Sequence, residues 1–314
     1  MMIAILYLCG TWYITLLYLV LSLLGIELIR LSNRIKPWYP CWITSHWKQT
    51  KLTVFFAVII GVSCLMHHAY NVVAHPVVTH VNIDLPKGEG NKHDSLTVVM
   101  ISDAHIGEII GKELVQHYVE LSNAQHPDMV VFVGDLLDYD LRVAEREHIE
   151  DDLLQLKAPL GVYAVNGNHE YRANRFSKRK WIQKISTLLI DSTVLIDNSF
   201  YLVGRDDYIN RARKSLRALV REVDKSKPVI LLDHQPWTFF EAAMNDVDLG
   251  LYGHTHYGQI WPYPLAMKLV YECAYGSYKK GNTQFYVSSG IGIAGPPYRV
   301  GTVSELVVLH IRFI

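Results

Sequence analysis

Two long apolar runs stand out at the start of the chain. The first extends from Ile3 to Ile26 without a charged residue, and the second from Leu52 to about Val73, with polar residues in its second half. Crossing a bilayer core takes roughly 20 apolar residues. The pattern therefore predicts a transmembrane helix in residues 1–30 and a weaker one in residues 52–74. The alternatives are a cleaved signal peptide for the first run and a buried core helix for the second.

The segment between the two runs is basic. Residues 31–51 contain lysine and arginine but no acidic residue, and short basic loops remain on the cytoplasmic side of a membrane. We therefore expect a cytoplasmic loop at 31–51 and a large domain outside the cytoplasm. Because Met1 and Met2 lead straight into the first run, there is room for further spans upstream. Residues 75–94 are interpreted as a linker.

Beyond the linker, short apolar runs alternate with amphipathic segments. Short, mostly apolar runs, typical of buried strands, occur at 96–101, 129–133, 161–165, 228–232 and 247–252. Helices are predicted at 111–124, 142–156 and 211–223, a hairpin at 194–204 and an alternating strand at 305–313. Strands alternate with helices first and cluster later. This order predicts an α/β domain over residues 95–314 with mixed sheets packed as a sandwich.

Side chains that can bind a metal follow five of these runs. In chain order they are Asp103 and His105, then Asp135 and Asp138, then Asn168, His169 and Glu170, then His234, and finally His254 and His256. Each cluster alone is weak evidence, because Asp-X-His arises by chance and an asparagine after a strand favours an Asx-turn. Ligands bind at the carboxyl ends of strands in α/β sheets. Together, the clusters therefore predict one shared metal site.

Charge and cysteine content narrow the function classes. The chain has 30 basic and 30 acidic residues, of which seven basic and four acidic ones precede Ser95, so the domain carries 23 and 26. A slight acidic excess argues against a nucleic-acid partner. Of the four cysteines, only Cys273 lies in the domain, so an internal disulfide cannot form there.

The five clusters, in this order, resemble the signature of the calcineurin-like metallophosphoesterases. The corresponding motifs are Asp103-X-His105, Gly134-Asp135-X-X-Asp138, Gly167-Asn168-His169-Glu170, His234 and Gly253-His254-Thr255-His256. The stretches 233–236, 248–259 and 290–305 are similar to a membrane-associated bacterial phosphodiesterase branch that includes UDP-diacylglucosamine pyrophosphohydrolase-like enzymes. Glu170 stands where many relatives have aspartate. The resemblance implies an α/β/β/α sandwich.

The resemblance also implies a role for each motif residue. Asp103, His105 and His256 would hold one divalent metal ion, Asn168, His234 and His254 would hold the other, and Asp135 would bridge them. Mixed oxygen and nitrogen ligands suit Mn, Fe or Zn. His169 would be catalytic without binding metal, and Asp138 and Glu170 would orient the ligands. Arg299 could contact a substrate phosphate or lie at the surface.

The function expected from this set is phosphoester hydrolysis. A hydroxide that bridges the metals would attack phosphorus, most readily in a phosphodiester of a phospholipid or a nucleotide-linked lipid. The lipid preference rests on the predicted membrane helices. The alternatives are a phosphomonoesterase or a nuclease of the same family, or a non-catalytic sensor that uses the metal pocket to bind a ligand.

Overall fold

The computed structural model describes residues 2–314, and the chain divides into two compact units. The helical unit comprises the chain up to Val72 together with Gly295–Tyr298. The catalytic unit comprises Val73–Ala294 and Arg299–Ile314. A short return segment therefore belongs to the helical unit although it is far away in sequence. Within that unit, the Tyr298 and Thr11 hydroxyls share a 2.6 Å hydrogen bond.

Two long helices make up most of the helical unit. They are α1 (Met2–Ile35) and α3 (Trp47–Ala74), joined through the short α2 (Cys41–Ser45). The stretches 7–35 and 47–74 are long and apolar enough to cross a membrane, and only 11% and 17% of their apolar windows are buried in the protein. Such exposure argues against a buried core helix. The expected loop at 31–51 is shorter than predicted, because α1 and α3 both continue into the basic segment.

The catalytic unit contains two six-stranded mixed sheets. The first has the strand order β1-β12-β2-β3-β4-β5 and the second β10-β11-β9-β8-β7-β6. The first-sheet strands are β1 (Val77–Leu85), β2 (Ser95–Ile101), β3 (Met129–Val133), β4 (Val162–Val165), β5 (Thr187–Leu188) and β12 (Glu305–Phe313). The second-sheet strands are β6 (Ser192–Ile196), β7 (Phe200–Gly204), β8 (Val229–Leu232), β9 (Leu249–Tyr252), β10 (Gly276–Lys280) and β11 (Thr283–Val287).

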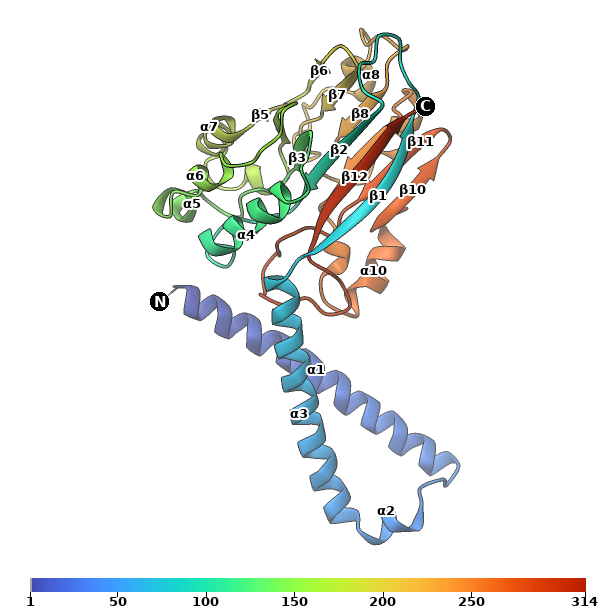
Figure 1. Ribbon diagram of the computed structural model, residues 1–314. Helices are drawn as coiled ribbons and strands as arrows, with labels where there is room; N and C mark the ends of the chain where they lie inside the picture. The colour runs from blue at the N-terminus through green and yellow to red at the C-terminus, as the bar shows by residue number, and fades with distance from the viewer. Residues whose placement is uncertain (1) are drawn as a thin grey trace. The chain divides into compact units, whose positions relative to one another are not determined.

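Helices cover the outer faces of the two sheets, and apolar side chains fill the space between them. On the first sheet these are α4 (Lys112–Asn123), α5 (Arg142–Arg146), α6 (Ile149–Leu153) and α7 (Arg175–Ile185), which lie together in Figure 1. On the second they are α8 (Leu216–Leu219) and α9 (Phe239–Met244). Met100, Val131, Leu232 and Leu251 pack between the sheets. This arrangement confirms the predicted α/β/β/α sandwich.

Three local predictions were wrong. Part of the expected linker is β1, which pairs in parallel with β12 from Val77↔Glu305 to Leu85↔Phe313, so the catalytic unit begins before residue 95. The helix expected at 142–156 divides into α5 and α6, because His148 between them has a left-handed backbone with φ of 51°. The helix expected at 211–223 is reduced to α8. There Arg213 hydrogen-bonds Asp206 O and Asp233 instead of lying on an exposed helix face.

The pattern also missed two elements between β9 and β11. These are α10 (Tyr263–Val270) and the edge strand β10. Figure 1 shows α10 apart from the group formed by α4 to α7.

Candidate metal centre

The structure brings the predicted strand-end residues to one place between the sheets. Asp103 and His105 follow β2, Asp135 follows β3 and Asn168 follows β4, all in the first sheet. His234 follows β8, and His254 and His256 follow β9, in the second sheet. Both groups come from carboxyl ends of parallel strands, which explains why side chains so far apart in sequence meet.

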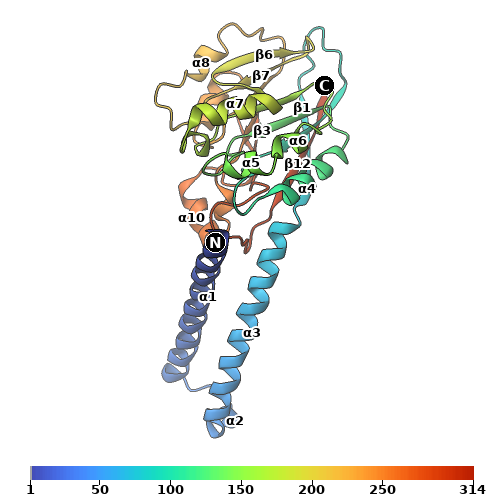
Figure 2. The ribbon, with the colours of Figure 1, turned by 90° about the vertical axis from the view of Figure 1, so that its left-hand side faces the viewer.

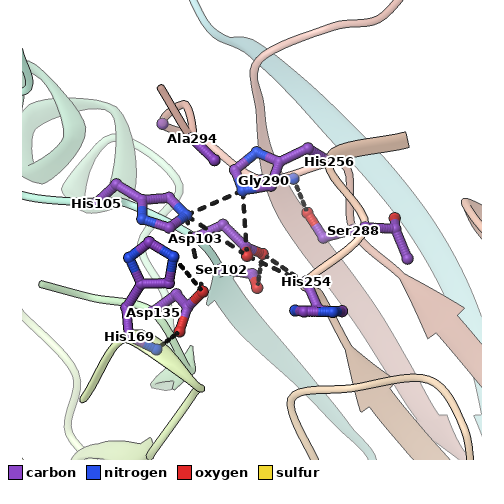
Figure 3. A network of polar contacts seen from close by, with 12 residues as sticks. Ser102, Asp103, His105, Asp135, His169, His254, His256, Ser288, Gly290 and Ala294 are labelled. Carbon is purple, nitrogen blue, oxygen red and sulfur yellow. Dashed lines mark hydrogen bonds and ion pairs between the residues drawn. The ribbon is translucent and has the colours of Figure 1, made fainter. Parts of the chain in front are cut away.

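The first donor group consists of Asp103, His105 and His256. The Nε2 atoms of the two histidines are 2.9 Å apart, and His256 Nε2 is 3.4 Å from Asp103 Oδ1. All three residues are buried. Figure 3 shows the rings of His105 and His256 directed at one another beside the Asp103 carboxylate. This group could hold a metal ion, because one ligand atom from each residue lies within 4.8 Å of the others.

The second donor group consists of Asp135, His234 and His254, by the same distance criterion. Asp135 Oδ2 lies 3.2 Å from His234 Nε2 and 3.8 Å from His105 Nε2, so this carboxylate stands between the two groups. Burial lowers the pKa of His254 to about 3. His254 is therefore neutral at pH 7, which is the protonation state a metal ligand requires.

Several buried atoms of the site test whether metal ions fit there. Asn168 Oδ1 is inaccessible to solvent and has no hydrogen-bond partner among the described residues, and His234 Nε2, 3.2 Å from Asp135 Oδ2, makes no well-aligned hydrogen bond. A buried polar atom without a partner is costly. Metal coordination would satisfy both atoms, and their imidazole, carboxylate and amide chemistry suits Mn, Fe or Zn. The residues present therefore fit divalent metal ions.

The backbone of the site is strained. Asp103, His105, Asp135, His254 and His256 all have φ between 46° and 71°, in the left-handed region that non-glycine residues seldom adopt. Clustered strain of this kind is typical of functional sites. The sharp turns point successive side chains back over the strand ends from which they come.

Glycines allow these loops to approach each other. A Cβ on Gly134, whose φ is 80°, would clash with the His234 ring, and a Cβ on Gly253 would clash with Ser102 and Asp103. The glycines in the Gly134-Asp135 and Gly253-His254 motifs are thus required by packing between the two sheets. Glycine occurs at these two motif positions because the loops approach each other too closely for a side chain.

Comparison with known proteins agrees with this geometry. Residues 96–258 match the family described as "Calcineurin-like phosphoesterase". The chain belongs to this family. Calcineurin-like phosphoesterases use two divalent metal ions, and the two donor groups described above could bind them.

Three relatives illustrate the similarity of this metallophosphoesterase to curated proteins. An "Uncharacterized metallophosphoesterase" of Helicobacter pylori is 33% identical over 77% of this chain and 65% of its own length. Another, of Campylobacter jejuni, is 31% identical over 81% of this chain and 68% of its own length. A bovine "Transmembrane protein with metallophosphoesterase domain" is 31% identical over 83% of this chain and 62% of its own length. The chain spans about two thirds of the length of these relatives.

Beside the donor groups of this metallophosphoesterase lies His169. Its Nδ1 is 2.9 Å from Asp138 Oδ1, and its Nε2 is 3.9 Å from Asp135 Oδ2. Its ring meets the His105 ring edge-on at 4.4 Å. Asp138 therefore holds Nδ1, which leaves Nε2 to face the centre. This arrangement supports the orienting role predicted for Asp138.

Glu170 connects the loops that follow β3 and β4. Its carboxylate accepts hydrogen bonds from the backbone N–H groups of Asp135, Leu137 and Gly167, at 2.7–3.1 Å. Glu170 is 1% exposed, so it cannot reach a substrate in solution. It joins the loops that follow β3 and β4, in keeping with the predicted supporting role.

Arg299 occupies a place that the sequence did not predict. Its side chain is fully buried, and Nη2 donates to the carbonyls of Ser289, Gly290 and Gly292 and lies 3.2 Å from His256 Nδ1. The surface expectation is wrong, because Arg299 is buried and its Nη2 is engaged by the loop after β11. Contact with a substrate phosphate stays a prediction. It holds that loop against His256.

Lys178 is buried beside the site, a position that its charge does not predict. Its Nζ is buried and donates to His169 O at 2.7 Å and to Asp138 O at 3.1 Å. The spacing of Lys178 with Trp181, Ile182 and Ile185 on α7 placed it on the inward face. This spacing was the available signal, although a lysine is rarely assigned to a core.

Proposed function

We propose that the chain is a membrane-anchored, metal-dependent phosphodiesterase that hydrolyses a phospholipid or a nucleotide-linked lipid. The observation that supports this most is the position of Asp135, whose Oδ2 lies between His234 of one donor group and His105 of the other. A carboxylate suits a shared position, because it can face two cations and cancel part of their charge.

The roles of the residues follow from this arrangement. Asp103, His105 and His256 would hold one ion, Asn168, His234 and His254 the other, and Asp135 both. When bound, the ions would supply a hydroxide nucleophile near neutral pH and neutralise charge that develops at phosphorus. His169 would stabilise the phosphoryl oxygens or protonate the leaving group through Nε2, because Asp138 occupies its Nδ1.

The helical unit supports the membrane part of the proposal. With α1 and α3 as spans, the basic residues between them favour a cytoplasmic connection and a catalytic unit outside the cytoplasm. The bovine and zebrafish relatives carry the name "Transmembrane protein with metallophosphoesterase domain". An anchored enzyme meets substrates of the membrane surface most often, which favours a lipid-linked phosphodiester.

Purified full-length protein in detergent, loaded with Mn²⁺, tests the reaction. It should hydrolyse an aryl phosphodiester faster than the matching aryl phosphomonoester, and lipid phosphodiesters can then be screened. His169→Ala should lower kcat by roughly 10²–10⁴-fold, as expected for loss of a general acid, while bound Mn²⁺ stays unchanged.

His117→Ala on α4, outside the donor groups, is the matched control and should keep full activity. A preference for the monoester would make the protein a phosphomonoesterase instead. Bound metal without hydrolysis of either ester would support the sensor alternative and overturn the proposal.

A further inference from the structure

The helix α10 has an apolar sequence, yet the protein does not bury it. Pro264 is its only buried residue, and Leu265, Leu269 and Val270 are 55%, 89% and 54% exposed. Trp261 just before the helix is 46% exposed. Clustered apolar residues left at a surface mark an interaction site rather than part of a core.

The position of α10 in the catalytic unit narrows the choice of partner. Trp261 N donates to Val300 O, and Val77 N, at the start of β1, donates to Ser304 O, both at 2.8 Å. The four residue-to-residue steps from Val300 to Ser304 span at most about 14 Å. Both views show α10 at the end of the catalytic unit where β1 begins (Figures 1 and 2). The start of α10 is therefore close to the point where the chain enters this unit.

That entry point is tied closely to α3. Only His75 and Pro76 separate the end of α3 from β1, a connection of at most about 10 Å. If α3 spans a bilayer, the first residues of β1, and with them the start of α10, are held near the bilayer surface. A second protein is not needed to explain an exposed apolar helix in such a position.

The side chains around α10 match the interface of a bilayer. Tryptophan and tyrosine concentrate at headgroup level, where the ring meets lipid and its polar group meets water. Trp261 lies just before α10, and Tyr263 is its first residue. Lys268 is exposed on the helix and Lys279 is exposed on the neighbouring β10, so both can face anionic headgroups. Leucines with aromatic and basic neighbours are typical of helices that lie in the interface.

The far end of α10 reaches the metal centre. Tyr271, which directly follows the helix, has its ring centroid 6.5 Å from that of His254 and 4.3 Å from that of Trp237. Trp237 is 45% exposed. A continuous row of aromatic rings thus joins the second donor group to the surface beside α10.

We infer that α10, with Trp261 and Tyr263, lies in the interfacial layer of the bilayer and sets the metal centre beside the headgroups of lipid substrates. This inference rests on the proposed membrane anchoring by α3. It deepens the proposed function, because a docked α10 favours a phosphodiester whose acyl chains stay in the membrane while its headgroup reaches His254.

Fluorescence quenching in proteoliposomes tests the docking. The protein is used at full length, with Cys9, Cys41, Cys64 and Cys273 replaced by serine, and a single cysteine carries an environment-sensitive label. Leu269→Cys reports on α10, Ile60→Cys on the middle of α3, and Asp246→Cys on an exposed polar position of the catalytic unit. Nitroxide lipids quench a label in the membrane, and iodide quenches a label in water.

The label at position 269 should show a blue-shifted emission and lose intensity to nitroxide lipids, while the label at 246 should respond to iodide only. A label at 269 quenched by iodide alone, or shielded from both quenchers by another protein surface, would overturn the inference. Absence of nitroxide quenching at position 60 would instead overturn the anchoring on which the inference rests.

Activity on two substrates gives an independent test. Leu265→Ser combined with Leu269→Ser should lower kcat/KM for a phosphodiester embedded in vesicles by roughly tenfold, and leave kcat/KM for a water-soluble aryl phosphodiester unchanged. Leu154→Ser, a leucine 59% exposed beside α6, is the matched control and should change neither value. Equal losses on both substrates, or no loss on either, would contradict a role in reaching lipid.

Discussion

The two sheets contribute different chemistry to the metal centre. The loops of the first sheet carry the predicted oxygen ligands Asp103, Asp135 and Asn168 and one imidazole, His105. The loops of the second sheet supply imidazoles only, from His234, His254 and His256. Neither sheet alone offers a complete site for two ions. The centre therefore exists only where the sandwich is closed.

Backbone contacts fasten the two halves together. His234 Nδ1 lies 2.8 Å from Val133 O at the end of β3, and His254 N donates to the Asp103 carboxylate at 3.0 and 3.1 Å. The tautomer of His234 that donates to a carbonyl leaves Nε2 free for a metal. The second sheet thus orients its imidazoles by hydrogen bonds to the first.

The largest loss of activity is expected from a substitution at Asp135, the ligand predicted to be shared by the two donor groups. Asp135→Ala removes the carboxylate between His105 and His234, and should lower kcat/KM by at least roughly 10³-fold, because metal ions contribute several kcal/mol at the transition state. Bound Mn²⁺, measured by elemental analysis, should fall below two ions per chain.

Asp135→Asn, which keeps one oxygen, should lose less activity and less metal than the alanine variant. Unchanged activity in Asp135→Ala would show that the two donor groups act separately.

Removal of the metal should loosen the junction between the sheets. Metal that binds only the folded state at about 100 times its Kd adds about 2.7 kcal/mol to the free energy of unfolding. Treatment with a chelator should therefore lower Tm by about 5–10 °C for a unit of this size. Thermal unfolding before and after addition of Mn²⁺ checks this, with Asp135→Ala as a variant whose Tm should respond less.

Arg299 tests how the second sheet holds its imidazoles. Arg299→Lys keeps the charge but cannot reach three carbonyls and His256 at once, so kcat should fall by roughly 10–100-fold, as for other groups that position metal ligands. KM for the aryl diester should stay nearly constant if Arg299 does not contact substrate. Arg312→Lys, an exposed arginine paired with Asp84, should have no effect.

The smallest effect concerns a buried carboxylate outside the donor groups. Burial alone would raise the pKa of Asp206, but hydrogen bonds from Asn166, Tyr171 and Asn210 hold it below the usual value. A lowered folded-state pKa stabilises the fold above the unfolded pKa of about 3.9, and this contribution is lost as pH falls through the folded pKa.

Asp206→Asn should therefore lower the free energy of unfolding by about 1–3 kcal/mol at pH 7, and the difference from the parent protein should narrow below about pH 4. Denaturant unfolding of both metal-free proteins at several pH values measures this difference in the free energy of unfolding. Asp246→Asn, an exposed carboxylate, should show no such difference.

Local pattern was sufficient for much of the fold. Apolar runs that end in polar residues predicted β2, β3 and β8 closely, because a strand buried on both faces needs a continuous apolar sequence. The motif residues from Asp103 to His256 were also identified in advance, since glycine, carboxylate and imidazole must occur at strand ends for the loops to meet. The roles of the individual ligands stay predictions until metal is measured in the variants.

Other features depended on contacts between distant parts of the chain. The residues of β1 alternate too weakly to indicate a strand, and only pairing with β12, more than 200 residues away, makes them one. Arg299 carries a charge that predicts exposure, but carbonyls of the loop after β11 surround it. The residues of α10 are apolar like those of a core element, yet Leu265, Leu269 and Val270 stay exposed.

The division between these two groups has a physical reason. Short-range periodicity, turn chemistry and motif spacing are properties of neighbouring residues, and they decide which elements form and which side chains follow them. Burial of a charge, pairing of an edge strand and exposure of an apolar helix depend on which surfaces finally face each other. The amino-acid order therefore specified the ligands, and the closed sandwich decided how they are held and which helix stays uncovered beside them.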